Sequence, residues 1–242
     1  SSRESKPRRR RSRRRAGVPR PTRAAVRVRY ARAMEIDPAS LSVRDRHLLL
    51  TGLVVPRPIA WVSTLAPDGT ANLAPYSFFA LVSSAPPTVV VSVGRRAGRE
   101  KDTLANARAS GELVVNLVSR SLVGPMNASS VESAPEHDEF AFAGVTPAPS
   151  RRVRPPRVAE ARAHLEARVV QVVPVPDDDG RVENHLILAR VVHVGIDDAL
   201  FTPPHRVDAV GLDPVARLAG LQYAGLGEVF ELPRPAAPDG AG

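Results

Sequence analysis

The chain has no cysteine, and this absence excludes several kinds of protein. Without thiols it has no disulfide framework, no thiolate metal site and no cysteine nucleophile. It also lacks any apolar run approaching the ~20 residues that a membrane-spanning helix requires. We therefore expect a cytoplasmic protein with no membrane partner.

Several familiar catalytic and nucleotide-binding patterns are missing as well. The sequence contains no GxGxxG, no GxxxxGK[ST], no HExxH and no G-x-S-x-G. Its six histidines form no tight group in the sequence. His185 and His193 lie eight residues apart on a predicted strand, hence on the same face, and we interpret them as ordinary strand residues. We therefore predict no metal site and name no catalytic residue.

Lysine is scarce, and positive charge is concentrated at one end of the chain. Of the 34 basic residues only Lys6 and Lys101 are lysines. Residues 1–33 carry thirteen arginines and one lysine against one glutamate, a net charge of +13. The remaining 209 residues carry 20 basic and 24 acidic side chains, a net charge of −4. The body is thus mildly acidic, and nucleic acid is not its expected ligand.

The basic segment, residues 1–33, is predicted to be disordered because it combines a block of like charge with scattered prolines. Nucleic-acid binding and an arginine-rich transit peptide are two functional interpretations. A twin-arginine signal is rejected because no apolar segment follows. The interpretation that we favour is an upstream extension before a working start at Met34. We expect one domain over residues 34–235 and a disordered C-terminus over residues 236–242.

From Met34 onward the pattern is mainly that of β-strands. One helix is expected over residues 38–51, and residues 57–65 alternate as a strand. Ala66-Pro67-Asp68-Gly69 predicts a turn, and the strand after it is expected to break at Pro75. Residues 132–160 form a Pro-rich connection. Further strands are predicted over residues 88–94, 112–119, 164–175 and 184–196, and short helices over residues 102–110 and 121–129. Many short antiparallel strands with few helices predict a barrel.

An ordered set of short motifs resembles the flavin reductase-like family, whose members fold as an FMN-binding split β-barrel. The set comprises a strand ending Ser63-Thr64, then N-x-A-P-Y-S, then S-x-x-P-P and a strand, then K-D-T opening a helix. The resemblance covers roughly residues 34–235. It implies an antiparallel Greek-key split barrel with a few flanking short helices. Ala219 departs from the family pattern, since a second glycine is common at its place.

The chemistry of FMN indicates which residues hold it. A helix N-terminus and a cation suit its phosphate, and Lys101-Asp102-Thr103 offers both, with Asp102 expected as the N-cap. A broken strand at Ala74-Pro75-Tyr76-Ser77-Phe78 offers backbone groups and an apolar wall to the ring. Ser63 and Thr64 are expected to reach the ribityl or pyrimidine oxygens. Arg95 and Arg96, which follow the predicted strand over residues 88–94, are expected to add positive charge for the phosphate. The aromatic residues are alternatively core side chains, and Asn72 and Asn116 are candidates of lower rank.

The resemblance implies an FMN-dependent oxidoreductase that takes hydride from NAD(P)H at flavin N5. Reduced flavin then serves a partner such as a monooxygenase, and the barrel pairs as a homodimer. Two alternatives remain open: an FMN-binding electron carrier without free-flavin turnover, and a nucleic-acid-binding protein acting through residues 1–33. Because the cofactor performs the difficult chemistry, the lack of a catalytic triad is no objection.

Overall fold

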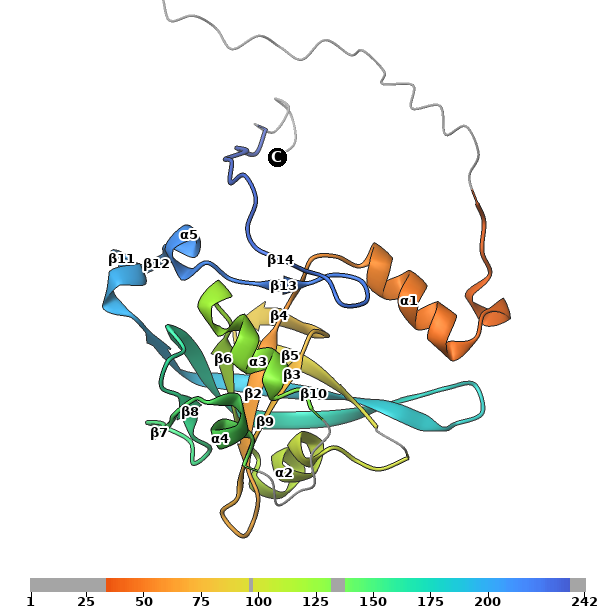
Figure 1. Cartoon of the computed structure of the whole chain (residues 1–242), viewed down its shortest axis with the longest axis horizontal. Coiled ribbons are helices and arrows are strands. Elements are labelled where there is room, and N and C mark those ends of the chain that lie inside the picture. Colours follow the sequence, from red (N-terminus) through yellow and green to blue (C-terminus); the bar gives the residue numbers. More distant parts are fainter. Residues whose placement is uncertain (1–33, 96–97, 132–137, 236–242) are drawn as a thin grey trace, which may run out of the picture. The chain divides into compact units, whose positions relative to one another are not determined.

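A computed structural model describes residues 34–95, 98–131 and 138–235 of the chain. The chain divides into two compact units, Ser1–Ser40 and Leu41–Gly242. The described part of the first unit holds one 3-10 helix, η1 (Pro38–Ser40). The basic and C-terminal segments predicted to be disordered lie outside the described residues. All other elements belong to the second unit (Figure 1).

The second unit is built around one antiparallel sheet of seven strands in the order β3-β2-β6-β9-β10-β5-β4. Strands β3 and β4 stand at opposite ends of this order, yet only residues 77–78 separate them in the sequence. The sheet must therefore curl until its ends meet, and Ser92 N donates to Phe78 O at 2.8 Å beside that junction. Its strands are β2 (Ala60–Leu65), β3 (Ala71–Tyr76), β4 (Phe79–Ser84), β5 (Pro87–Gly94), β6 (Glu112–Leu117), β9 (Ala163–Pro176) and β10 (Val182–Ile196).

Short strands and helices surround this barrel. The result confirms the expected class, a mainly β, antiparallel Greek-key split barrel with a few flanking short helices. No helix in the described part of the chain is long and apolar enough to cross a membrane. The short strands are β1 (Arg57–Pro58), β7 (Pro147–Ala148), β8 (Arg157–Val158), β11 (Phe201–Thr202), β12 (Arg206–Val207), β13 (Ala216–Arg217) and β14 (Tyr223–Ala224). The helices are α1 (Val43–Leu53), α2 (Asp102–Ser110), η2 (Arg120–Leu122), α3 (Val123–Ala128), α4 (Glu139–Ala143), η3 (Asp198–Leu200) and α5 (Ala209–Leu212).

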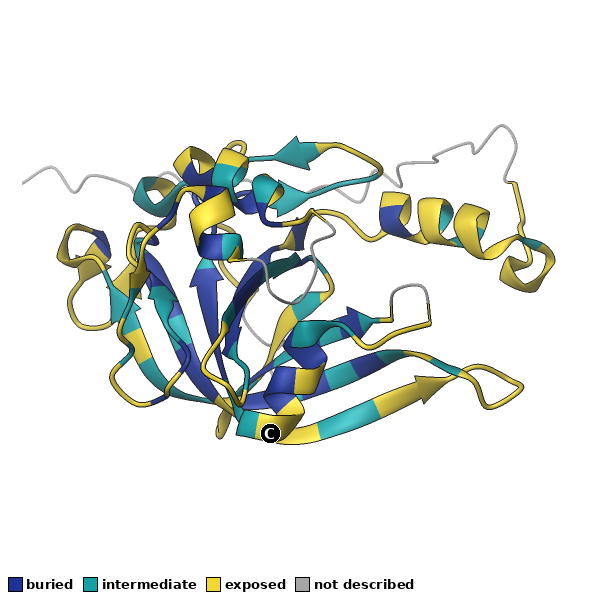
Figure 2. Ribbon diagram, turned by 60° about the horizontal axis from the view of Figure 1, so that its bottom comes forward, coloured by how far each residue is buried: buried dark blue, intermediate teal, exposed yellow. Residues whose placement is uncertain are grey.

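Alternation along β2 divides the core into two clusters, as its sequence pattern predicts. Ala60 and Val62 belong to the cluster inside the barrel. Ile59 and Trp61 belong to a second cluster on the opposite face of the strand, which includes residues of α3 and α4. Figure 2 shows the central strands largely buried. The two faces of β2 therefore pack against different layers.

Helix α1 differs from the helix expected over residues 38–51. It begins at Val43, because Ser42 caps it by accepting a hydrogen bond from Asp45 N at 3.1 Å. It runs through Gly52 to Leu53, which is 70% exposed. Thr51 is the one buried residue of the helix, and Figure 2 shows its surface mainly exposed. The leucines of this helix are therefore at least partly exposed in the described part of the chain.

The prediction that the strand breaks at Pro75 is wrong. Strand β3 continues to Tyr76, with Pro75 paired opposite Trp61. β3 lies at the edge of the sheet order, and an edge strand tolerates proline because one side of it needs no donor. The break falls instead at residues 77–78.

The expected irregular connection over residues 132–160 contains regular structure where it is described. Helix α4 is capped by Asp138, whose side chain accepts from Ala141 N at 3.0 Å. Strands β7 and β8 then form a two-stranded sheet. Tertiary packing stabilises these short elements, since Phe140 and Val158 are buried in the second cluster.

The prediction that His185 and His193 share a face of one strand is also wrong. Val191 of β10 pairs with Ala167 of β9, and His193 pairs with Glu166. Two steps along β10 thus correspond to one step along β9. Val192 is therefore an additional residue on β10, a β-bulge. The bulge reverses the alternation, so His193 leaves the interior side on which Val191 packs.

Candidate functional site

Three segments distant in sequence meet where β2, β3 and the start of α2 come together. Thr64 and Asn72 face each other across β2 and β3, and Thr103 lies in the first turn of α2. Asn72 Nδ2 donates to Thr103 Oγ1 at 3.0 Å and to Thr64 Oγ1 at 3.4 Å. Asn106, one helical turn after Thr103, donates to Thr64 Oγ1 at 3.2 Å. All four side chains are buried, so this polar network fixes the position of the helix.

Lys101 stands directly before α2 and brings a positive charge to its N-terminus. Its ammonium nitrogen lies 5.4 Å from the centroid of the Tyr76 ring at the end of β3. Helix α2 begins at Asp102, so Lys101 occupies the N-cap position and makes no side-chain capping bond. The expectation that Asp102 is the N-cap is therefore wrong, and Asp102 lies instead in the first turn. An acidic residue there interacts favourably with the helix dipole.

Ser63 is not brought together with Thr64, although the two are adjacent in the sequence. Its hydroxyl donates to Pro156 O at 2.5 Å, on the opposite face of β2. Asn116 Nδ2 lies 3.4 Å from the same hydroxyl and donates to Trp61 O at 3.0 Å, while Asn116 Oδ1 accepts from Val158 N at 2.8 Å. Ser63 and Asn116 thus connect β2 and β6 to the segment around β8.

A pocket of ≈280 Å³ adjoins the junction between β3 and β4. Four of the predicted residues, Pro75 to Phe78, line it together with residues of α1, α3 and the C-terminal segment. Phe78 is 45% exposed, and its ring centroid lies 6.3 Å from that of His47 on α1. The predicted ring-binding stretch therefore borders a real cavity. Ala74 is half-buried and packs against the barrel core.

Arg57 is a buried residue that lines this pocket. Its guanidinium donates to Thr51 O at 2.6 Å and to Leu218 O at 2.8 Å, which ties the end of α1 to the C-terminal segment. Its buried Nε has no hydrogen-bond partner among the described residues. Burial, and then the nearby charge of Arg217, lowers the pKa of Arg57. The guanidinium nevertheless stays charged at neutral pH, because arginine titrates far above it.

Arg95 bonds to the segment that leads into α2, three residues before Lys101. This residue is exposed after the end of β5, and its guanidinium donates to Gly98 O. Its backbone N–H donates to Glu183 O at 2.7 Å, beside β10. Arg96 lies outside the described residues.

Sequence reasoning did not select several residues of this region. Asn106 belongs to the buried network, and its spacing of three residues from Thr103 on a helix was the available signal. Arg57, His47 and Arg217 line the pocket but belong to no recognisable local motif. Long-range contacts bring them together, and a local pattern does not reveal such contacts.

The chain belongs to the flavin reductase-like family. The model of the flavin reductase like domain matches residues 52–210, which include all seven strands of the barrel. The pocket residues on α1 and in the C-terminal segment lie outside this range. An uncharacterized protein of Halalkalibacterium halodurans is 41% identical over 203 residues, covering 84% of this chain and 97% of the relative.

Two solved structures are similar to this chain in both sequence and fold. One is nitrilotriacetate monooxygenase component B from Bacillus cereus, 37% identical, with a TM-score of 0.80 over 83% of this chain and 99% of the other. The other is Pseudomonas fluorescens 2-nitrobenzoate 2-nitroreductase, 27% identical, with a TM-score of 0.76 over 86% of this chain and 100% of the other. The barrel and its flanking elements are thus common to all three.

Proposed function

We propose that this protein is an FMN-binding oxidoreductase that uses NAD(P)H. The observation that carries the proposal is the meeting of Lys101, the N-terminus of α2 and the end of β3, with the Lys101 ammonium 5.4 Å from the Tyr76 ring centroid. Membership of the flavin reductase-like family supports a flavin as the ligand.

The donor set at the start of α2 suits a phosphate. The first N–H groups of a helix have no acceptor within the helix, and the helix dipole favours an anion there. Lys101 adds a full positive charge, and Asp102 and Thr103 contribute the first backbone N–H groups of the helix. In this proposal Thr103 also offers its hydroxyl, which the amide of Asn72 orients at 3.0 Å.

The end of β3 suits a flat, partly polar ring. Tyr76 and Phe78 provide aromatic surface, and the strand break at residues 77–78 leaves backbone groups beside the ≈280 Å³ pocket. Thr64 contributes a hydroxyl from β2. The Ser63 side chain is not part of this proposed site, because its hydroxyl already bonds to Pro156 O on the other face of the strand.

The chain's own task in this chemistry is to bind and orient. FMN, when held by these residues, would supply the hydride chemistry with NAD(P)H. Pocket residues such as Phe78, His47 and Arg217 then limit what reaches the ring. We name no general acid or base, because the proposed step requires only alignment of two rings and exclusion of water.

We also propose that the reduced flavin serves a monooxygenase or a related acceptor. The support is similarity to a protein named as a monooxygenase component B. A carrier that retains its flavin is the alternative.

The proposed homodimer has support of its own. Leu53 and Val54 at the end of α1 are 70% and 63% exposed, and Leu81 on β4 is 68% exposed. Leu53 and Val54 closely follow the pocket residue Thr51 in the chain, and Leu81 closely follows Phe78, so a second copy packed there would cover these residues and enclose the pocket. Light scattering of the full chain tests this: the dimer is expected for the wild type, and a monomer for Leu53→Asp. A wild type that is monomeric at all concentrations contradicts the dimer.

A visible absorption spectrum of the purified full chain, before and after addition of FMN, tests the flavin site. Flavin bands that remain with the protein on gel filtration are expected. Anaerobic addition of NADH or NADPH is then expected to bleach them. Turnover of free flavin identifies a reductase, whereas slow turnover with firmly retained flavin identifies a carrier. A protein that takes up no FMN contradicts the proposal.

A further inference from the structure

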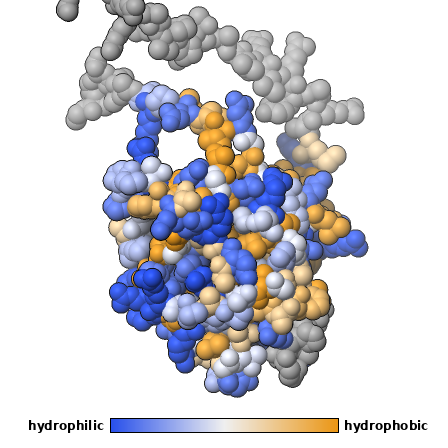
Figure 3. Space-filling view, turned by 60° about the vertical axis from the view of Figure 1, so that its left-hand side comes forward, coloured by the Kyte–Doolittle hydropathy of each residue, from blue (hydrophilic) through white to orange (hydrophobic). Residues whose placement is uncertain are grey.

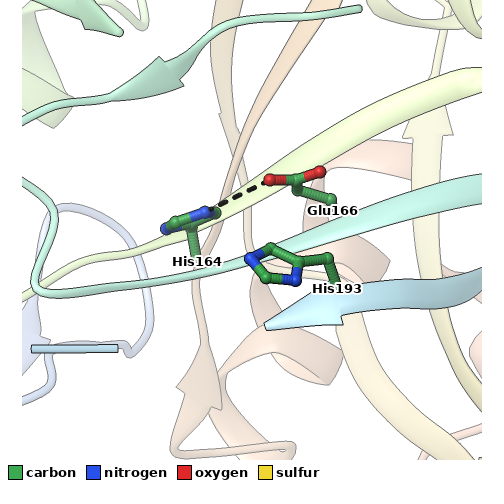
Figure 4. Close-up of side chains that lie close together, drawn as sticks. All are labelled: His164, Glu166 and His193. Carbon is green, nitrogen blue, oxygen red and sulfur yellow. Dashed lines mark ion pairs between the residues drawn. The ribbon is translucent and has the colours of Figure 1, made fainter. Parts of the chain in front are cut away.

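Two histidines and a glutamate meet on the side of the barrel that bears β8. His164 and Glu166 lie on β9, and His193 lies on the neighbouring strand β10 (Figure 4). One ligand atom from each lies within 4.8 Å of the others, and His164 Nε2 is 3.6 Å from Glu166 Oε1. Among the described residues, this is the one such group that has the composition of a metal site. None of the three belongs to the proposed flavin site.

Glu166 is the fixed member of this triad. Its side chain is fully buried, and its two oxygens accept from Arg151 N at 2.8 Å and from Arg152 N at 2.5 Å. These two N–H groups fix the orientation of the carboxylate. Each oxygen keeps a further lone pair, so the anchored carboxylate remains able to bind a cation.

The backbone around His164 is shaped to admit its ring. Gly195 lies opposite on β10, and a Cβ at that position would stand 2.0 Å from His164 Cε1. No side chain other than hydrogen fits there. The bulge after Val191 meanwhile turns His193 to the same side, with the two imidazole centroids 6.3 Å apart. Two independent backbone features thus assemble the triad.

The triad opens into a pocket of ≈620 Å³ that gives an ion access. Three arginines and three carboxylates line this pocket. Arg162 is already paired with Asp197 at 2.9 Å, and Glu160 accepts from Thr146 N. Arg157 opposes a cation, but the carboxylates balance the arginines in number. Figure 3, which brings the left-hand side of Figure 1 forward, shows a surface on which hydrophilic and hydrophobic patches alternate.

We propose that His164, Glu166 and His193 bind a divalent transition-metal ion of the zinc class. Two imidazoles and one carboxylate are ligands that zinc accepts, and three protein ligands leave a fourth position for water from the pocket. Ligand atoms about 2.1 Å from a tetrahedral ion stand about 3.4 Å apart. The His164–Glu166 distance of 3.6 Å is already close to this value. His193, which is half-buried, has to approach the other two ligand atoms, which lie within 4.8 Å, by up to roughly 1.4 Å.

The bound ion would join β9 to β10 and, through Glu166, to the backbone at residues 151–152. We therefore expect a structural role: the ion holds the segment that carries β7 and β8 against the barrel. Flavin binding depends on α2 and β3 and is expected to be unchanged by metal removal.

Calorimetric titration of the chelator-treated, tag-free full chain with ZnCl₂ at pH 8 tests the proposal. We expect one equivalent to bind and the thermal midpoint to rise, since a ligand that binds only the folded state stabilises it. His193→Ala is expected to weaken binding by more than the about 10- to 100-fold that loss of an outer partner costs. His205→Ala removes an exposed histidine outside the triad and serves as the matched control.

A second variant and a second probe keep the test decisive. Gly195→Ala, which crowds His164, is expected to weaken Zn²⁺ binding while His193 remains in place. Cobalt(II) should give visible bands with the wild type and lose them in His193→Ala. A wild type that does not bind one equivalent of Zn²⁺ overturns the proposal. So does a Zn²⁺ affinity that falls equally in His193→Ala and in His205→Ala. Retained flavin uptake shows in each case that the variant is folded.

Discussion

The two faces of β2 both carry buried polar groups, but they use them differently. On the face towards α2, Thr64 receives hydrogen bonds from two amide side chains, and this network borders the position of Lys101. On the other face, Ser63 bonds to a backbone carbonyl, and Asn116 bonds to the backbone of two segments. The first face gathers hydroxyls and amides beside a cation, whereas the second joins strands together.

This difference shows that a polar motif in a strand divides between two tasks. Adjacent residues of a strand point to opposite sides, so a Ser-Thr pair cannot place both side chains against one ligand. Changes on the α2 face should therefore alter flavin affinity, and changes on the opposite face should alter stability. Four substitutions test this separation, from the largest expected effect to the smallest.

Trp61→Ala should have the largest effect, and on stability alone. Trp61 is fully buried, and its Nε1 donates to Ser129 Oγ at 2.8 Å. A cavity and a lost hydrogen bond should lower the free energy of unfolding by about 3–5 kcal/mol. Denaturant unfolding measures this loss. A loss below about 1 kcal/mol would show that this face is not part of the scaffold.

Thr103→Val should lower FMN affinity more than stability. Removal of a hydrogen bond to a charged phosphate costs about 1.5–3 kcal/mol, or about 10- to 150-fold in Kd. The valine keeps the shape of the side chain, and Asn72 keeps its contact with Thr64 at 3.4 Å. Fluorescence quenching of FMN measures the Kd. An unchanged Kd would remove Thr103 from the phosphate site.

Ser63→Ala provides the opposite result from the neighbouring face. The partly buried acceptor Pro156 O loses its side-chain donor, so the free energy of unfolding should fall by about 1–3 kcal/mol. The Kd for FMN, measured under conditions in which the variant is folded, should stay at the wild-type value. A Kd raised as much as by Thr103→Val would abolish the distinction between the faces.

Arg108→Ala should have the smallest effect on either property. Arg108 lies on α2, the helix that Lys101 precedes, but it forms an exposed ion pair with Glu100. Such pairs contribute about 0–1 kcal/mol. Thermal unfolding and FMN titration should both stay close to wild type. A large loss of FMN affinity would mean that net charge on α2, and not the position of Lys101, governs binding.

Much of the fold was predictable because its signals are local. The alternation along β2, the turn at Ala66 to Gly69 and the start of the helix after Lys101 follow from neighbouring residues, and the structure confirms them. The strand pattern predicted a barrel, and family resemblance supplied its split Greek-key topology, since strand order depends on long-range pairing. It also supplied the candidate residues, of which Thr64, Lys101 and Thr103 lie together.

The errors came from effects that a local pattern does not contain. Pro75 is tolerated because β3 is an edge strand, which only the assembled sheet reveals. The faces of the histidines on β10 depend on a bulge after Val191, which moves His193 from one side to the other. Arg57 and Arg217 enter one pocket through the pairing of β1 with β13, strands about 160 residues apart in the chain.

The most direct test of the flavin site is a titration of wild type and Lys101→Ala with FMN and, separately, with riboflavin, which lacks the phosphate. If Lys101 holds the phosphate, the variant should lose about 10- to 150-fold in FMN affinity and nothing in riboflavin affinity. Equal loss for both ligands, or no loss for either, would contradict the assignment of the phosphate to the start of α2.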